Sequence, residues 1–515
     1  MTQLLLQEPI YQPDWPVSAA MGRKIIKRHF DFCGYSYEIA GHVHWHPEGV
    51  GDDWCRAFFS FSWLQEVVAV GNNHVAAAFI REFVHHFTQL SKHDAIHPSA
   101  GELEVVGERL SHWLYYRALI IEGSQDVAVK RYQRSLMRYV RQLYEVASLE
   151  PESLGPSAIK GLIVAACTIP SLAFMLHEVL GWLDELMARD IQEDGSHISH
   201  SPNHHFAFLK TLIEMRDALA HTYVAYDPLN DTITRMGAIL QMFTHGDGRL
   251  ALFHDNIMEE ADMLAQVIDA ARATYEGETD ASESALAPVT YAEHAGYGCF
   301  RAGASCLFIR MIPAHSTTPP LGVSSLEFSE GAERIFVNCG SYIGQSEQWQ
   351  QAMQQTSAFS TVTLDGHRQP VRHGYIAQSV EEKPDHHHAS LQYMLHDYIR
   401  HERRLSLTMD GRRLTGHDTV TLVNPPPSYQ VPSLVARFHL HPDMRCQPYD
   451  EGGYVLKSLS GVQWRFSCDG AQEMAIEESV YLGYYGKPQK TLQLVMRLPL
   501  DDSHSSLSWS LEKVV

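Results

Sequence analysis

The apolar residues of this 515-residue chain follow two different periods. Between residues 51 and 275 they recur every three or four positions, which places them on one face of an α-helix. The pattern is clearest in 73–90, where Phe79, Phe83 and Phe87 are spaced four residues apart. It predicts about nine helices, at residues 57–69, 73–90, 104–121, 127–147, 157–169, 171–189, 204–222, 231–244 and 257–274.

From residue 290 onward the period is close to two, because β-branched and aromatic residues alternate with polar ones. Many short runs of this kind, separated by turns such as Asp410-Gly411, indicate an antiparallel β-sandwich. The expected strands are 306–312, 324–328, 335–339, 360–364, 390–398, 403–409, 412–422, 435–441, 453–458, 462–467, 478–485, 490–497 and 506–511.

These patterns predict an α+β multidomain chain, in which an incomplete α/α toroid is followed by an antiparallel β-sandwich. A helical solenoid or an irregular bundle fits the helical period almost equally well. Four segments are expected: an irregular lead-in over 1–50 with short strands at 30–39 and 42–46, a helical domain over 51–275, an acidic linker over 276–289 and the sandwich over 290–515.

The charge balance narrows the range of partners. The formal net charge is −21, from 40 basic and 61 acidic residues, whereas nucleic-acid binding needs a basic face. No apolar run approaches the roughly 18 to 20 residues of a membrane helix. We therefore expect neither nucleic acid nor a membrane span, and the oligomeric state stays open. The 31 histidines fit compositional drift or tolerance of acid, with a pH switch as the alternative.

The eight cysteines and the N-terminus indicate in which cellular compartment the protein resides. No CxxC pair occurs, and several cysteines lie within apolar runs, as buried free thiols do in reducing compartments. The N-terminus has three consecutive leucines, but it lacks the basic start and the apolar core of a signal peptide. We expect a cytoplasmic protein, with the periplasm as the less favoured alternative.

The stretch 312–363 joins the two parts. A loop rich in Pro, Ser and Thr precedes two short apolar runs, 324–329 and 335–339, which are separated by a glycine-containing turn. Such runs predict a β-hairpin. A loop of this composition between a helical part and a β part is a natural place for a functional site.

Several strings, in order along residues 50 to 425, resemble motifs of the heparinase II/III-like family of polysaccharide lyases. They are DGSHISHSPNHH at 194–205, HGDGRLALF at 245–253, LEFS at 326–329 with FVNCG at 336–340, and HDYIRHERRL at 396–405 with DGRRL at 410–414. Each string is short, and their order makes the set specific.

The resemblance implies β-elimination of a polysaccharide that contains uronic acid. Such a lyase neutralises the substrate carboxylate, removes the poorly acidic C5 proton and protonates the leaving oxygen. Family members are expected to use a Tyr and a His for proton transfer, with an Asn or a His near the carboxylate. The implied catalytic candidates are His204, His205, His315 and Tyr398. The implied substrate contacts are Asn203, His200 and Arg403.

The chain departs from the family pattern at four places. His204 stands where the family has its catalytic Tyr, and the family's His-Ala-His falls near 318–320, which holds Thr, Pro and Pro. An Asn used by some members falls near Gly155 or Pro156. A metal site of some members corresponds to Pro320, Asn338 and Phe359, which are poor ligands. We therefore expect no metal at that site and no cofactor.

The histidines also have structural interpretations. Residues 197–205 can form a solvated helix entry, in which Ser201 caps the helix and Pro202 begins it. Pro202 argues against His200 and His204 as a helical metal pair. The histidines at 386–388 are expected to lie in a solvated turn rather than in a metal tract.

Three functions remain compatible with the sequence. The first is a polysaccharide lyase with a rearranged histidine site, whose partner is an acidic polysaccharide or oligosaccharide. The second is a catalytically silent glycan-binding protein. The third is a scaffold protein of polysaccharide metabolism that uses only the fold. The substitutions in 312–363 move any chemistry toward the histidines at 197–205.

Overall fold

The structure is a computed structural model. It describes residues 11–41, 43–90, 94–253, 259–272, 286–314, 316, 320–364, 377–427, 429, 433–449, 452–484, 487–498 and 504–514. The predicted catalytic residue His315 and the greater part of the predicted linker 276–289 lie outside these ranges.

The chain separates into two compact units that alternate along the sequence. The helical unit comprises Met1–Ile191, Ala207–Thr234 and Asp269–Ala285. The sandwich unit comprises Gln192–Phe206, Arg235–Ile268 and Leu286–Val515. Two segments inside the predicted helical domain, 192–206 and 235–268, thus pack with the sandwich. The predicted lead-in over 1–50 belongs to the helical unit.

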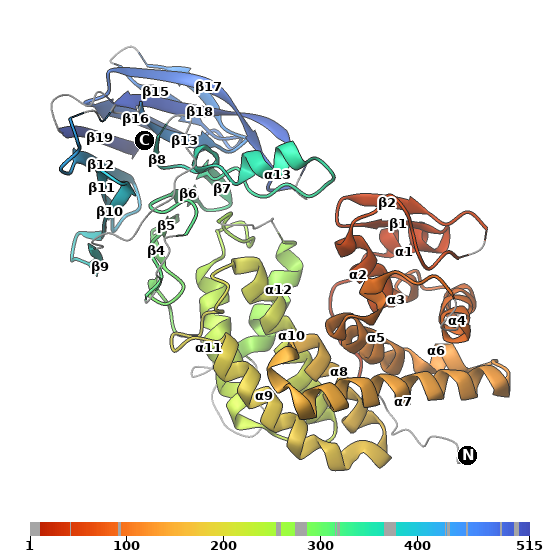
Figure 1. The fold of residues 1–515 in the computed structure, drawn as a ribbon. Coiled ribbons are helices and arrows are strands. Elements are labelled where there is room, and N and C mark those ends of the chain that lie inside the picture. The colour runs from red at the N-terminus through yellow and green to blue at the C-terminus, as the bar shows by residue number, and fades with distance from the viewer. Residues whose placement is uncertain are drawn as a thin grey trace. The chain divides into compact units, whose positions relative to one another are not determined.

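Helices make up most of the first half of the described chain (Figure 1). They are α1 Ala19–Ile26, α2 Asp52–Ser60, α3 Leu64–Val68, α4 Asn73–Gln89, α5 Leu103–Tyr115, α6 Arg117–Ile121, α7 Asp126–Leu149, α8 Pro156–Thr168, α9 Leu176–Asp190, α10 Pro202–His221, α11 Asp227–Met242 and α12 Ala261–Arg272, with 3₁₀ turns at Pro98–Gly101, Pro151–Ser153 and Pro170–Met175. A short hairpin, β1 His29–Phe32 and β2 Tyr35–Glu38, follows α1. Residues 43–46 form no strand, so that prediction was wrong.

The helical unit is held by an aromatic core and by a buried ionic network. Trp45 packs against Phe58, Phe83 and Phe87, with ring centroids 4.8 to 6.3 Å apart. This is the apolar face that the four-residue spacing predicted. Fully buried aromatic rings of this size dominate the packing energy of a core.

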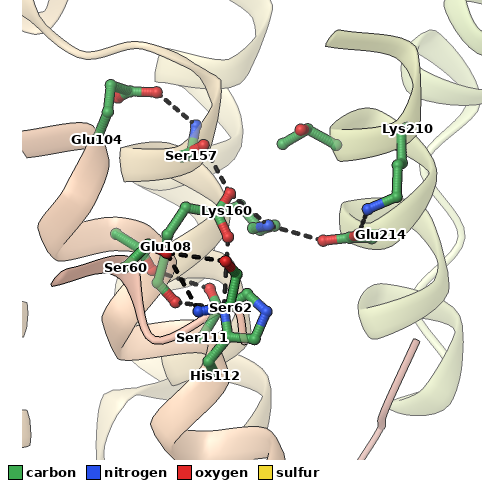
Figure 2. A network of polar contacts seen from close by, with 12 residues as sticks. Ser60, Ser62, Glu104, Glu108, Ser111, His112, Ser157, Lys160, Lys210 and Glu214 are labelled. Carbon is green, nitrogen blue, oxygen red and sulfur yellow. Dashed lines mark hydrogen bonds and ion pairs between the residues drawn. The ribbon is translucent and has the colours of Figure 1, made fainter. Parts of the chain in front are cut away.

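The ionic network joins α5, α8 and α10, as Figure 2 shows. Lys160 Nζ lies 2.7 Å from a carboxylate oxygen of Glu108 and 2.7 Å from one of Glu214. Lys210 Nζ lies 3.1 Å from Glu214. Although burial raises the pKa of Glu214, the two lysines hold it below its usual range. The charges are compensated within the network, and this compensation is what allows them to be buried.

The sandwich unit contains two antiparallel sheets. Its strands are β3 Tyr291–Ala292, β4 Tyr297–Ala302, β5 Ser305–Arg310, β6 Leu326–Glu330, β7 Glu333–Val337, β8 Val362–Leu364, β9 Ala377–Glu382, β10 His386–His396, β11 Ile399–Thr408, β12 Arg413–Leu422, β13 Leu434–Leu440, β14 Arg445–Pro448, β15 Tyr454–Lys457, β16 Gln463–Asp469, β17 Glu473–Tyr481, β18 Gln489–Leu498 and β19 His504–Lys513. A short helix, α13 Glu347–Met353, follows β7.

The strand order places sequence-distant strands side by side. The eight-stranded sheet has the order β14-β15-β16-β19-β12-β11-β10-β9. The nine-stranded sheet has the order β17-β18-β13-β7-β6-β5-β4-β3, with β8 paired to β13. One buried apolar cluster fills the space between the sheets, with Phe328, Phe438, Trp464 and Trp509 at its centre. The predicted class, a helical toroid followed by an antiparallel β-sandwich, is confirmed.

Most predicted elements recur with small shifts at their ends. The predicted hairpin is β6–β7, whose turn contains Gly331 at φ +53°. Residues 386–388 begin β10 instead of forming a turn, because the His387 side chain turns inward and stacks on Phe300 at 5.1 Å. Across the described residues, no helix is long and apolar enough to cross a membrane.

Replacing Lys160 with Met tests the buried network. The change leaves the carboxylates of Glu108 and Glu214 in an apolar setting without their shared cation. Removing one partner of a buried ion pair costs about 3–5 kcal/mol, so the free energy of unfolding in urea should fall by that amount. The matched variant Lys210→Met removes a more exposed lysine and should cost about 1 kcal/mol or less. Equal losses in both variants would contradict this account.

Candidate functional site

The histidine-rich segment 194–205 is fixed by the side chain of Asp194. Its carboxylate accepts hydrogen bonds from the backbone and hydroxyl of Ser196 at 2.9 and 2.6 Å. Its second oxygen accepts the backbone N–H of His294 at 2.9 Å. The Tyr297 hydroxyl donates to the His200 carbonyl at 2.9 Å. The segment is therefore held against the start of the nine-stranded sheet.

His205 is buried and both of its ring nitrogens have backbone partners. Nδ1 accepts the N–H of His197 at 3.3 Å, so Nε2 carries the proton and donates to the Met236 carbonyl at 2.8 Å. Burial lowers the pKa of His205 to about 4. A neutral imidazole held in this way links the segment to α11, and neither nitrogen is left to move a proton of a substrate.

His204 and Asn203 occupy the first turn of α10. Ser201 caps this helix by accepting the N–H of His204 at 3.3 Å, and Pro202 begins it, as the sequence suggested. The His204 side chain is exposed. The Asn203 amide donates to Glu259 at 2.8 Å. His200 precedes the helix at φ +56°, a left-handed conformation that places it in the turn and outside the helix.

The predicted residues on the eight-stranded sheet do not meet the histidine segment in a common polar site. Tyr398 lies in the turn between β10 and β11 and packs on Tyr429 at 5.1 Å. Arg403 is buried, and its Nε and Nη2 bind the two oxygens of Asp418 at 2.7 and 3.0 Å. Its Nη1 donates to the carbonyls of Ser324 and Ser360. Arg403 thus binds an internal carboxylate in the bidentate manner expected for a substrate.

Two of the family-like strings meet at a buried carboxylate, that of Glu327 on β6. His245 Nε2 lies 2.9 Å from Glu327 Oε2, and its Nδ1 lies 2.7 Å from the Ser329 hydroxyl. The backbone N–H groups of Leu252 and Asn338 donate to Glu327 at 3.1 and 2.8 Å. Burial raises the pKa of Glu327 to about 7, while these donors and Arg334 lower it.

A cavity of about 310 Å³ adjoins this cluster. Arg334 lies in its wall and binds Asp247 through two hydrogen bonds of 2.9 and 3.0 Å. His441 and Tyr484 also line it, with 3.4 Å between the imidazole and the hydroxyl. The lining combines cations, carboxylates and one phenol, an arrangement suited to binding a polar group.

The residues at the family's metal positions make structural contacts. The Asn338 amide oxygen accepts the N–H of Ser360 at 2.9 Å, and its nitrogen donates to Glu327. Phe359 belongs to an apolar cluster with Cys339 and Leu482. Within the described ranges, no group of three or more His, Cys, Asp or Glu is placed to hold a metal ion.

The start of α8, where the family's Asn would fall, holds an internal anion. The Glu104 carboxylate accepts the backbone N–H groups of Gly155, Ser157 and Ala158 at 2.8 to 3.2 Å (Figure 2 draws the Ser157 contact). A helix N-terminus favours an anion. Here the carboxylate comes from α5 of the chain itself.

Sequence reasoning found the histidine segment and missed the buried charges. A signal was present for some of them: Lys160 interrupts the apolar run IKGLIVAA, and Glu327 interrupts LEFS. A charged residue inside an apolar run has to find a buried partner. The partners themselves, Glu214 and His245, lie 54 and 82 residues away along the chain.

Comparison with known proteins shows which family the sandwich unit resembles. Residues 285–510 match the family model described as "Heparinase II/III-like, C-terminal". This segment is a heparinase II/III-like C-terminal domain, and the resemblance seen in the sequence is confirmed.

Solved structures and a curated relative extend the comparison to the whole chain. A crystal structure of heparinase III matches with a TM-score of 0.74 at 12% identity, covering 100% of this chain and 88% of that one. The heparan sulfate lyase HepC of Pedobacter heparinus matches with a TM-score of 0.64 at 12% identity, covering 98% and 85%. FtsZ-localized protein C of Caulobacter vibrioides is 25% identical over 494 residues, which are 88% of this chain and 81% of the relative.

The pH dependence of stability tests whether His205 is buried in its neutral form. His205 stays neutral in the folded protein, while in the unfolded chain it takes up a proton below its ordinary pKa of about 6.5. Stability is therefore lost as the pH falls from about 6.5 towards 4, by about 2 kcal/mol at pH 5 for such a histidine. In urea unfolding at pH 7 and pH 5, His205→Gln should lose about 2 kcal/mol less than the parent protein between the two pH values. The exposed neighbour supplies the control, His204→Gln, which should keep the parent's pH dependence; an unchanged dependence in His205→Gln would refute the assignment.

Glu327→Gln tests the buried carboxylate. The carboxylate of Glu327 accepts hydrogen bonds from the N–H groups of Leu252 and Asn338. In the variant, the NH₂ group of the amide faces one of these donors, and the two donors cannot bond each other. A buried donor without an acceptor costs about 1–3 kcal/mol, and the free energy of unfolding should fall by that amount. Chemical denaturation at pH 7.5 measures the loss. A variant as stable as the parent would show that Glu327 is protonated and already acts as a donor.

Proposed function

We propose that this chain is a non-catalytic heparinase II/III-like protein that serves as a scaffold associated with FtsZ. The observation that carries the proposal is the internal use of the polar groups at the family's functional positions. His205 has both ring nitrogens bound to the backbone, and Arg403 is bound by Asp418.

A β-elimination site needs a base near C5, a proton donor and a cation for the substrate carboxylate. Among the described candidates, His205 and Arg403 contact the protein itself, whereas the His204 side chain is exposed. Arg403, the cation, is wholly buried, and exposing it would leave Asp418 without its partner. The α8 N-terminus, a second possible anion site, is filled by Glu104.

The likeness to FtsZ-localized protein C supports the scaffold assignment. That relative matches 88% of this chain, including both units, at 25% identity, whereas the heparinase III and HepC structures share 12%. A scaffold requires the surface and the stability of the fold and makes no demand on catalytic residues. A cytoplasmic location, expected from the pattern of the cysteines, is part of this proposal.

Co-sedimentation with FtsZ from the same organism tests the proposal. Purified full-length protein should pellet with FtsZ polymers in the presence of GTP and stay in the supernatant when GTP is omitted. In parallel, incubation with a panel of uronic-acid glycans should leave the absorbance near 232 nm unchanged, because no unsaturated product forms. Failure to pellet with FtsZ removes the scaffold assignment.

The lyase remains a second candidate, favoured by one observation. His204 is exposed on the first turn of α10, at the position of the family's Tyr, with Asn203 beside it. A rise in absorbance at 232 nm that is abolished by His204→Ala, and preserved in His177→Ala on α9, would establish this candidate. A rise that persists in His204→Ala would place the chemistry elsewhere.

A further inference from the structure

The outer face of the eight-stranded sheet carries an open groove of about 560 Å³. Along each strand the side chains alternate between the sandwich core and this face. In β12, for example, Leu414 and Asp418 are buried, while Thr415 and His417 are partly exposed. The groove lies entirely within one sheet and involves none of the family-derived catalytic candidates.

The strand register lines up hydroxyl groups across four neighbouring strands. Ser406 of β11 pairs with Thr415 of β12, Thr415 pairs with Ser510 of β19, and Ser510 pairs with Ser467 of β16. His388 of β10 pairs with Ser406 and extends the row. Because neighbouring strands are about 4.8 Å apart, the four hydroxyls repeat at that interval and span about 14 Å. We call this set the hydroxyl row.

Two members of the row have free hydrogen-bonding capacity. The Ser467 and Ser510 hydroxyls bond each other at 3.0 Å. Ser406 and Thr415 line the groove, and their hydroxyls form no hydrogen bond with another described residue. A hydroxyl both donates and accepts, so the row can bind alternating polar groups of a ligand.

Basic side chains stand on either side of the row. Arg404 and His417 form the next paired position on one side, and Arg413 lies on the other. Both arginine side chains are more than half exposed. Arg404 pairs with Glu402, and Arg413 pairs with Glu512 at 2.9 Å. Exposed ion pairs of this kind contribute little stability, so an anionic ligand can compete for the guanidinium groups.

The spacing and the chemistry of the lining favour a glycan. An extended peptide presents side chains to one face about every 6.6–6.8 Å, which does not match an interval of about 4.8 Å. In an extended chain of pyranose rings, successive rings are spaced by about the distance between neighbouring strands, and each ring carries hydroxyls. The lining contains no exposed aromatic ring on which a neutral sugar would stack, since Trp509 faces the core. Arg404 and Arg413 outnumber the one lining carboxylate, Asp469, and favour a glycan that carries negative charge.

We propose that the hydroxyl row and its flanking arginines form a binding site for a linear acidic oligosaccharide that lies across strands β11, β12, β19 and β16. The row bonds the ring hydroxyls, and Arg404 and Arg413 bind carboxylate or sulfate groups. Glycan binding at this face is independent of the histidines at 197–205 and is a function additional to association with FtsZ.

Calorimetric titration of the full-length protein with a linear oligogalacturonate octamer tests the site. Thr415→Glu places a carboxylate in the middle of the row and should weaken binding about tenfold or more through like-charge repulsion. Thr419→Glu adds the same charge on the same face of β12, outside the groove, and should change the affinity by about twofold or less. Raising the salt concentration should weaken binding by the parent protein.

The other outcomes each overturn the proposal. Equal weakening by Thr415→Glu and Thr419→Glu would show a general charge effect, and absence of binding at millimolar octamer would remove the site. Tighter binding of poly-glutamate than of the octamer would assign the face to an acidic polypeptide. Loss of binding in His204→Ala would place the glycan at α10. Thr415→Glu should still pellet with FtsZ, so failure of this site and failure of the scaffold assignment are distinguishable.

Discussion

The sandwich unit depends on one buried carboxylate, that of Glu327. It gathers His245 and the N–H of Leu252 from the segment 243–253, and the N–H of Asn338, which directly follows β7. The free-energy cost of burying an isolated carboxylate in an apolar interior is prohibitive. All of these donors therefore have to be present together. The requirement joins a helix-flanking loop to the β6–β7 hairpin, and it explains why two short strings so far apart in sequence both carry the family likeness.

Two other buried charges are likewise bound by several partners at once. In the helical unit Lys160 is shared by two carboxylates, and in the eight-stranded sheet Asp418 accepts from Arg403, His401 and the Trp509 indole. Each charge has several partners, which satisfies its hydrogen-bonding capacity and ties three elements together. Polar residues in the interior thus specify which elements are neighbours, while the apolar residues supply the larger part of the driving force.

The sequence predicted the elements well because their periods are local properties. The resemblance implied that Arg403 contacts a substrate, and in the structure it lies on the core side of β11 with Ile399 and Leu405, where its partner Asp418 emerges only from the strand pairing. His204 and His205 show the limit most clearly. They are identical and adjacent, yet one is exposed and the other is held by two backbone groups, because a helix turns its side chains by about 100° per residue. The hydroxyl row was likewise invisible, since it depends on the register of four strands.

The alternation of the two units along the chain has a consequence for how the protein is made. Residues 192–206 and 235–268 leave the ribosome before the sheets that they contact, and His245 meets Glu327 only after a further 82 residues have been synthesised. The helical unit likewise receives its last segments after parts of the sandwich unit exist. Maturation of the two units is therefore concerted, and a single cut between residues 275 and 290 would yield two incomplete fragments in place of two domains.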